Sequence, residues 1–81
     1  MAVVSGFERV PRDRLGVHPT STQCEWIDFE SHGQRFLQLS TGGSIQRQHP
    51  GKVSQTLQLN AAAARRLHEI LETAFPELRT R

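Results

Sequence analysis

Residues Pro50 to Pro76 place a strand and a helix one residue apart, and this junction most constrains the fold. From Val53 to Leu59 apolar and polar residues alternate, a period of two that is typical of a half-buried strand. Asn60 follows as a helix N-cap, because its side-chain oxygen can accept from a free N–H of the first turn. Pro76 predicts that the helix ends at Phe75. Within the helix, small and apolar residues recur at steps of three and four and share one stripe: Ala63, Ala64, Leu67, Ile70, Leu71 and Ala74.

Three more strands are predicted before this junction. Thr22 to Glu30 and Arg35 to Thr41 are rich in aromatic, β-branched and apolar residues, and Ser31 to Gln34 supplies a hairpin turn with a glycine. Ser44 to Gln48 is a shorter strand with one apolar residue, Ile45. The sequence therefore predicts an α+β fold, an antiparallel four-stranded meander followed by one C-terminal amphipathic helix (β-β-β-β-α).

Alternation also predicts which strand residues face the helix. We expect that face to be apolar and to carry Ile27, Phe29, Leu37, Leu39, Val53, Leu57 and Leu59. The opposite face is expected to be polar and nearly uncharged, with Trp26 nearby, and to carry Phe36, Gln38, Ser40, Ser54, Thr56 and Gln58. An antiparallel sheet can show such a face to water without any further role.

The chain of 81 residues has room for one domain. We divide it into a flexible arm (1–20), in which Val3 and Val4 could add to a sheet edge, a single α+β domain (21–77) and a tail (78–81). Domains this small tend to be only marginally stable unless a disulfide, a bound metal or a partner subunit stabilises them. Cys24 is the sole cysteine, so no internal disulfide is possible, and no zinc spacing is present. A homodimer is the natural expectation, with Leu67, Ile70 and Leu71 as its interface.

Location and chemistry are predicted from patterns that the sequence lacks. It shows neither the apolar run of a signal peptide nor a stretch of transmembrane length, so we expect a soluble, cytoplasmic protein without membrane contact. It has no nucleophile elbow, no HExxH and no P-loop. Asp28 and Glu30 share a strand face and could act as acid and base or bind a cation, but such pairs are mostly solvated carboxylates. We predict no enzyme, no cofactor, no metal and no small-molecule substrate.

The charge distribution is more informative than the net charge of +2. No carboxylate occurs from Ser31 to His68, whereas five cations do: Arg35, Arg47, Lys52, Arg65 and Arg66. A segment of one sign is either a footprint for phosphate or an ordinary solvated surface.

Aromatic side chains complete a candidate site for nucleic acid. Bases could stack on Trp26 or Phe36 while Arg35, Arg47 and Lys52 meet phosphates, as in proteins that bind single strands. Burial of both rings in a small core is the alternative, and the carboxylates of Asp28 and Glu30 on the strand of Trp26 would repel a phosphate backbone.

The segment from His49 to Phe75, HPGKVSQTLQLNAAAARRLHEILETAF, resembles the C-terminal half of the transcriptional coactivator family named positive cofactor four. The resemblance rests on a proline-glycine-lysine turn, a strand and a helix with leucines at matching steps, and covers residues 24 to 75. It implies a curved four-stranded sheet with a helix, dimerisation through helices, and single-stranded DNA held on the sheet. Lys52 would match the basic turn, and Arg35 and Phe36 would lie on the binding strand. The family's helix has an early aromatic residue at the position of Ala64, and its strands hold more lysines.

The chain is also similar to small uncharacterised proteins of bacterial plasmids and integrative elements, through its PGKVSQ turn and closing FP. Two functions follow from the sequence. The first is non-enzymatic binding of nucleic acid by a homodimer, with single-stranded DNA held on the sheet face. The alternative is a protein-interaction module, an accessory protein of a mobile genetic element, that binds no nucleic acid and docks a partner at a strand edge or polar face.

Overall fold

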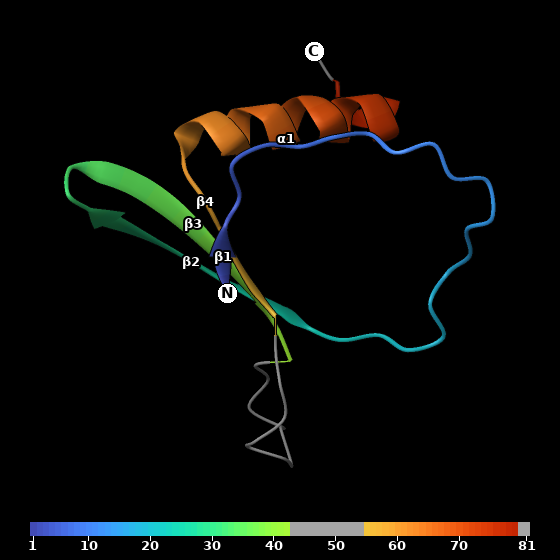
Figure 1. Cartoon of the computed structure of the whole chain (residues 1–81), viewed down its shortest axis with the longest axis horizontal. Helices are drawn as coiled ribbons and strands as arrows, with labels where there is room; N and C mark the ends of the chain where they lie inside the picture. The colour runs from blue at the N-terminus through green and yellow to red at the C-terminus, as the bar shows by residue number, and fades with distance from the viewer. Residues whose placement is uncertain (43–54, 80–81) are drawn as a thin grey trace.

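The computed structural model describes residues 1–42 and 55–79. They form a four-stranded sheet in the order β1-β4-β3-β2 and a helix that leaves one end of it (Figure 1). The elements are β1 (Ala2–Val3), β2 (Cys24–Ser31), β3 (Gln34–Thr41), β4 (Thr56–Leu59), α1 (Ala61–Ala74) and the 3₁₀ turn η1 (Pro76–Leu78). The α+β class, the four-stranded sheet and the C-terminal helix are as predicted.

The sheet is mixed, so the prediction of an all-antiparallel meander is wrong. β1 pairs in parallel with β4, Ala2 beside Leu57 and Val3 beside Gln58, and the Val4 amide donates to the Gln58 carbonyl at 2.8 Å. This edge strand comes from the segment that we assigned to a flexible arm. The strand predicted at 44–48 and the first residues of the one predicted from Val53 lie outside the described residues.

The β2–β3 hairpin fixes the register of the sheet. Its two turn residues, His32 and Gly33, both have positive φ (52° and 81°), as a type I′ turn requires. Ser31 therefore pairs with Gln34, and the ladder continues to Cys24 opposite Thr41. Because directly paired residues lie on the same face of a sheet, this register decides which side chains of β2 accompany those of β3.

Two faces result, and β2 is turned over relative to our prediction. The helix-side face carries Ala2, Trp26, Asp28, Arg35, Leu37, Leu39, Leu57 and Leu59. The outer face carries Ile27, Phe29, Phe36, Gln38, Ser40, Thr56 and Gln58. Ile27 and Phe29 thus face away from the helix and Trp26 faces its side, the reverse of the expected arrangement. A register slip by one residue moves every side chain of a strand to the other face.

The helix is anchored at its first turn. Asn60 caps it, accepting from the Ala63 amide at 2.9 Å. Leu59 and Ala63, 3% and 7% exposed, are the buried core among the described residues. Beyond this turn α1 extends away from the strands, and the N-terminal segment after β1 runs beside it before returning to β2 (Figure 1). No helix within residues 1–42 and 55–79 has the length and apolar character to cross a bilayer.

Replacing the N-cap tests the role of this junction. We expect Asn60→Ala to lower the free energy of unfolding by about 1 kcal/mol, because it leaves a first-turn N–H without its acceptor. Urea denaturation followed by circular dichroism measures the change. Asn60→Asp keeps an acceptor oxygen and is expected to retain most of the stability; equal losses for both variants would contradict the capping role.

Candidate nucleic-acid interface

The outer face combines aromatic rings with side chains that can form hydrogen bonds. Phe29 and Phe36 stack at the hairpin end, with ring centroids 5.5 Å apart and an interplanar angle of 20°. Toward the centre, the Gln58 Nε2 donates to the Gln38 Oε1 at 2.8 Å. All four side chains are half-buried, so the pairs that they form are ordered and still reach solvent.

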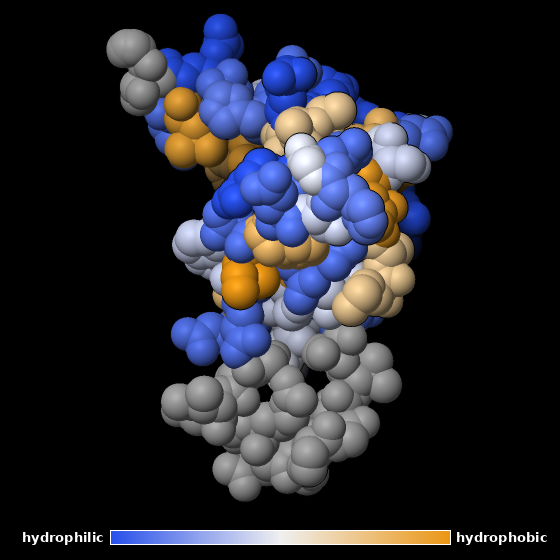
Figure 2. Space-filling model, turned by 90° about the vertical axis from the view of Figure 1, so that its left-hand side faces the viewer, coloured by the Kyte–Doolittle hydropathy of each residue, from blue (hydrophilic) through white to orange (hydrophobic). Residues whose placement is uncertain are grey.

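A second polar pair continues the outer face. The hydroxyls of Ser40 and Thr56 lie 3.1 Å apart. Glu25, which pairs with Ser40, is the one carboxylate on this face within the described strands. Figure 2 views the molecule from the left-hand side of Figure 1, the side away from which α1 extends. It shows a mostly hydrophilic surface broken by small apolar patches. This part of the sheet offers aromatic and polar contacts and little negative charge.

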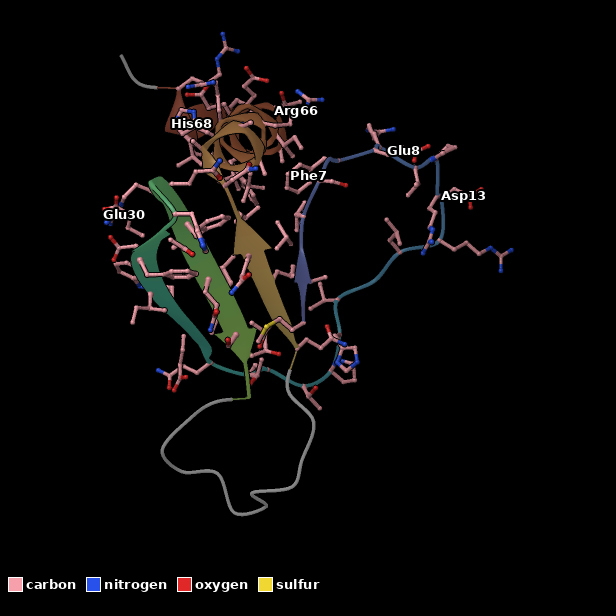
Figure 3. All side chains as sticks on the ribbon, turned by 60° about the vertical axis from the view of Figure 1, so that its left-hand side comes forward. Phe7, Glu8, Asp13, Glu30, Arg66 and His68 are labelled. Carbon is pink, nitrogen blue, oxygen red and sulfur yellow. The ribbon has the colours of Figure 1, made fainter. Side chains whose placement is uncertain are left out.

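The structure divides the predicted nucleic-acid site between the two faces. Phe36 lies on the outer face, whereas Trp26 and Arg35 lie on the helix-side face. Arg35 forms an ion pair with Asp28, both exposed, and stands directly opposite Glu30 (labelled in Figure 3). The guanidinium of Arg35 is therefore paired with a carboxylate of its own sheet. Arg47 and Lys52, the other two predicted contacts, lie outside the described residues.

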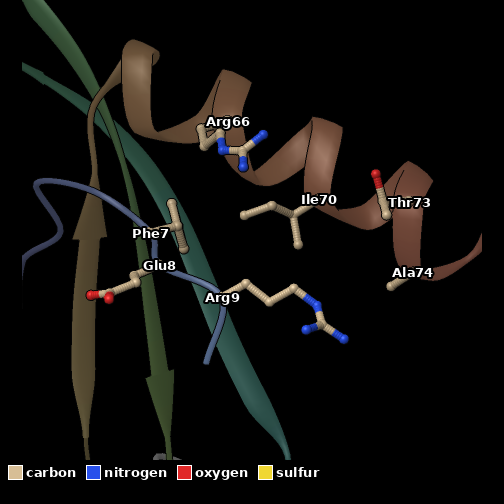
Figure 4. A pocket seen from close by; sticks show the side chains of 7 residues that line it. All are labelled: Phe7, Glu8, Arg9, Arg66, Ile70, Thr73 and Ala74. Carbon is tan, nitrogen blue, oxygen red and sulfur yellow. The ribbon is translucent and has the colours of Figure 1, made fainter. Parts of the chain in front are cut away.

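The predicted dimer residues lie on α1, and the N-terminal segment covers part of them. Ile70 lines a groove of about 500 Å³ with Arg66, Thr73 and Ala74 from the helix and Phe7, Glu8 and Arg9 from the segment after β1 (Figure 4). Leu67 is half-buried and Leu71 is exposed. Helical spacing places Leu67 and Ile70 on the side of buried Ala63 and puts Leu71 beside them. Homodimerisation through these residues stays a prediction.

The remaining reactive groups are dispersed. Cys24 is an exposed thiol. On α1, Arg66 pairs with Glu69 at 3.1 Å, and the His68 Nδ1 lies 3.8 Å from a Glu72 carboxylate oxygen. In the part of the chain that the structure describes, no three His, Cys, Asp or Glu side chains gather where they could hold a metal ion.

Phe29 is the site residue that our reading of the sequence missed, since we placed it under the helix. The sequence of the hairpin turn contained the information needed to place it. A two-residue turn at His32-Gly33 pairs residues 31 and 34, and counting outward sets Phe29 opposite Phe36 and Trp26 opposite Leu39. The register of the hairpin, rather than the apolar character of each residue, identifies the aromatic pair.

Comparison with known proteins returns no relative: no protein-family model matches the chain, and neither does a curated protein or a solved structure.

A double-mutant cycle measures the aromatic pair in solution. Replacing Phe29 and Phe36 by Leu, singly and together, is expected to give a coupling of about 0.5–1.5 kcal/mol, the range for stacked rings. Urea denaturation supplies the four unfolding free energies. The control cycle joins Phe36 with Phe75, at the far end of α1, and is expected to show additivity; coupling of equal size in both cycles would argue against a specific stack.

Proposed function

We propose that this protein binds single-stranded nucleic acid on its outer sheet face and catalyses no reaction. The observation that carries the proposal is the stacked pair of Phe29 and Phe36 beside the hydrogen-bonded side chains of Gln38 and Gln58. Proteins that hold single strands without base readout combine aromatic platforms with a nearby cationic track.

Each part of the outer face has a chemical role in this proposal. A base stacked on the half-buried ring of Phe36 would gain about 1–3 kcal/mol. The amides of Gln38 and Gln58 and the hydroxyls of Ser40 and Thr56 both donate and accept, so they can meet any base or sugar without selecting one. The expected binding is therefore tolerant of sequence.

Phosphate contacts are assigned by sequence to Arg47 and Lys52, which lie between the end of β3 and the start of β4. Arg35 is a weaker candidate than we expected, because it is paired with Asp28 on the opposite face. A cytoplasmic accessory protein of a bacterial mobile element is the setting that we propose, since single-stranded DNA arises there during transfer and repair.

The first test is anisotropy of a labelled oligothymidylate titrated with protein at low and moderate salt. Phe36→Leu is expected to weaken binding roughly tenfold, because it removes the stacking ring. Phe75→Leu makes the same chemical change at the C-cap of α1 and is expected to leave affinity unchanged. Flat titrations at low salt, or equal losses for the two variants, would contradict the proposed face.

Salt dependence tests the phosphate contacts separately. Neutralising Arg47 and Lys52 together with Gln is expected to reduce the slope of log affinity against log salt by about 1.4, since each contact to a single strand contributes about 0.7. Arg35→Gln serves as the matched control and is expected to keep the slope. An unchanged slope in the double variant would remove Arg47 and Lys52 from the site.

The position of β2 at an edge of the described sheet favours a second candidate, a protein-interaction module. β2 is the outermost strand of the described sheet, eight residues long and largely exposed. An extended peptide could add to such an edge through main-chain hydrogen bonds. Selection from a displayed peptide library, followed by amide hydrogen exchange, would favour this candidate if bound peptides slow exchange in β2 while oligonucleotides do not bind.

A further inference from the structure

An open hollow on the outer face lies next to the aromatic pair. Its volume is about 390 Å³, and it is lined by Glu25, Trp26, Ile27, Gln38 and Ser40. All of these residues except Trp26 belong to the outer face. Glu25 pairs with Ser40 and Ile27 with Gln38, so Glu25 and Gln38 are diagonal neighbours on one face of the sheet. Long side chains at such positions can reach a common ligand.

The polar atoms of the hollow comprise one fixed donor and two acceptors. The Gln38 Oε1 accepts from the Gln58 Nε2 at 2.8 Å, which orients the Gln38 amide. The Gln38 Nε2 has no acceptor among the described residues and can donate to a ligand. The Glu25 side chain is exposed and has no ion-pair partner within residues 1–42 and 55–79, so both of its carboxylate oxygens can accept.

Guanine carries the complementary set of groups on its Watson–Crick edge, where O6 accepts and the neighbouring N1–H and N2–H₂ both donate. Cytosine and adenine offer one amino group beside a ring nitrogen that accepts, and thymine offers one N–H between two carbonyls. A carboxylate that receives both guanine donors forms charge-assisted hydrogen bonds, which are shorter and stronger than neutral ones. Bases of unpaired strands are commonly recognised on this edge.

We propose that this hollow selects guanine at one position of the bound single strand. Glu25 accepts from N1–H and N2–H₂, and the Gln38 Nε2 donates to O6. Ile27, whose side chain is 58% exposed, offers an apolar surface to the ring. The inference rests on the proposed function, because the base that stacks on Phe36 belongs to the same strand. At the remaining positions of the face, binding stays tolerant of sequence.

The negative charge of Glu25 also acts against the wrong ligand. Glu25 is the one carboxylate on the outer face within the described strands. Any other base would set a carbonyl oxygen or an accepting ring nitrogen against its oxygens, and a phosphate would meet a charge of its own sign. Discrimination therefore combines paired donors for guanine with repulsion of its competitors.

Anisotropy of labelled strands measures the preference. Replacing the central thymine of an oligothymidylate by guanine is expected to tighten binding about tenfold, within the range for a bidentate contact to a base. A single guanine keeps the probe from forming the structures of guanine runs. Hypoxanthine in the same place keeps O6 and N1–H but lacks the N2 amine, so it is expected to lose most of the gain.

Two matched variants assign the preference to the hollow. Glu25→Gln sets an amide N–H₂ against a guanine donor and is expected to abolish the preference while plain oligothymidylate still binds. Glu30→Gln removes the same charge from the helix-side face and is expected to keep it.

The outcomes separate this inference from the proposed function. Equal affinity for the thymine and guanine strands, with both bound, would overturn the guanine site alone. Equal loss of the preference in both variants would assign it to net charge and overturn the site as well. If neither strand binds, the proposed function and the guanine site fail together.

Discussion

The contact between Leu59 and the first turn of α1 is the constraint on which the other features depend. Asn60 ends the strand and begins the helix in a single residue, so the direction of α1 is set by one capped turn. The helix consequently covers only the end of the sheet. On the same face Trp26 and Leu57 stay exposed, and the segment after β1 lines a groove with the helix.

The type I′ turn at His32-Gly33 sets the second constraint. By pairing Ser31 with Gln34 it sends Trp26 to one face and the two phenylalanines to the other. The aromatic side chains of the sheet are thereby separated into two groups with different surroundings. Phe29 and Phe36 stand beside amides and hydroxyls, whereas Trp26 continues a row of aliphatic side chains. Stacking with bases suits the first setting, and burial against another apolar surface suits the second.

Local signals in the sequence were sufficient for the elements but not for all of their relations. The alternation from Val53 to Leu59, the Asn60 cap and the stop at Pro76 predicted α1 and the described part of this strand, β4, because each depends on neighbouring residues. The faces of β2 were assigned wrongly, since apolar character alone does not fix register. The parallel pairing of Ala2–Val3 with β4 has no local signature. Of the candidate site, Phe36 was placed on a polar sheet face correctly, and its neighbour Phe29 was not.

The pairing of β1 with β4 also orders events in folding. It joins residue 2 to residue 57. The long stretch of chain between them must therefore be brought together before a strand of only two residues can contribute its hydrogen bonds, and contacts of this kind form late in folding. The hairpin of β2 and β3 closes over two residues and can form first. By the same reasoning, β1 is the part of the sheet that opens most readily, and its departure uncovers the edge of β4 to the corresponding strand of another chain.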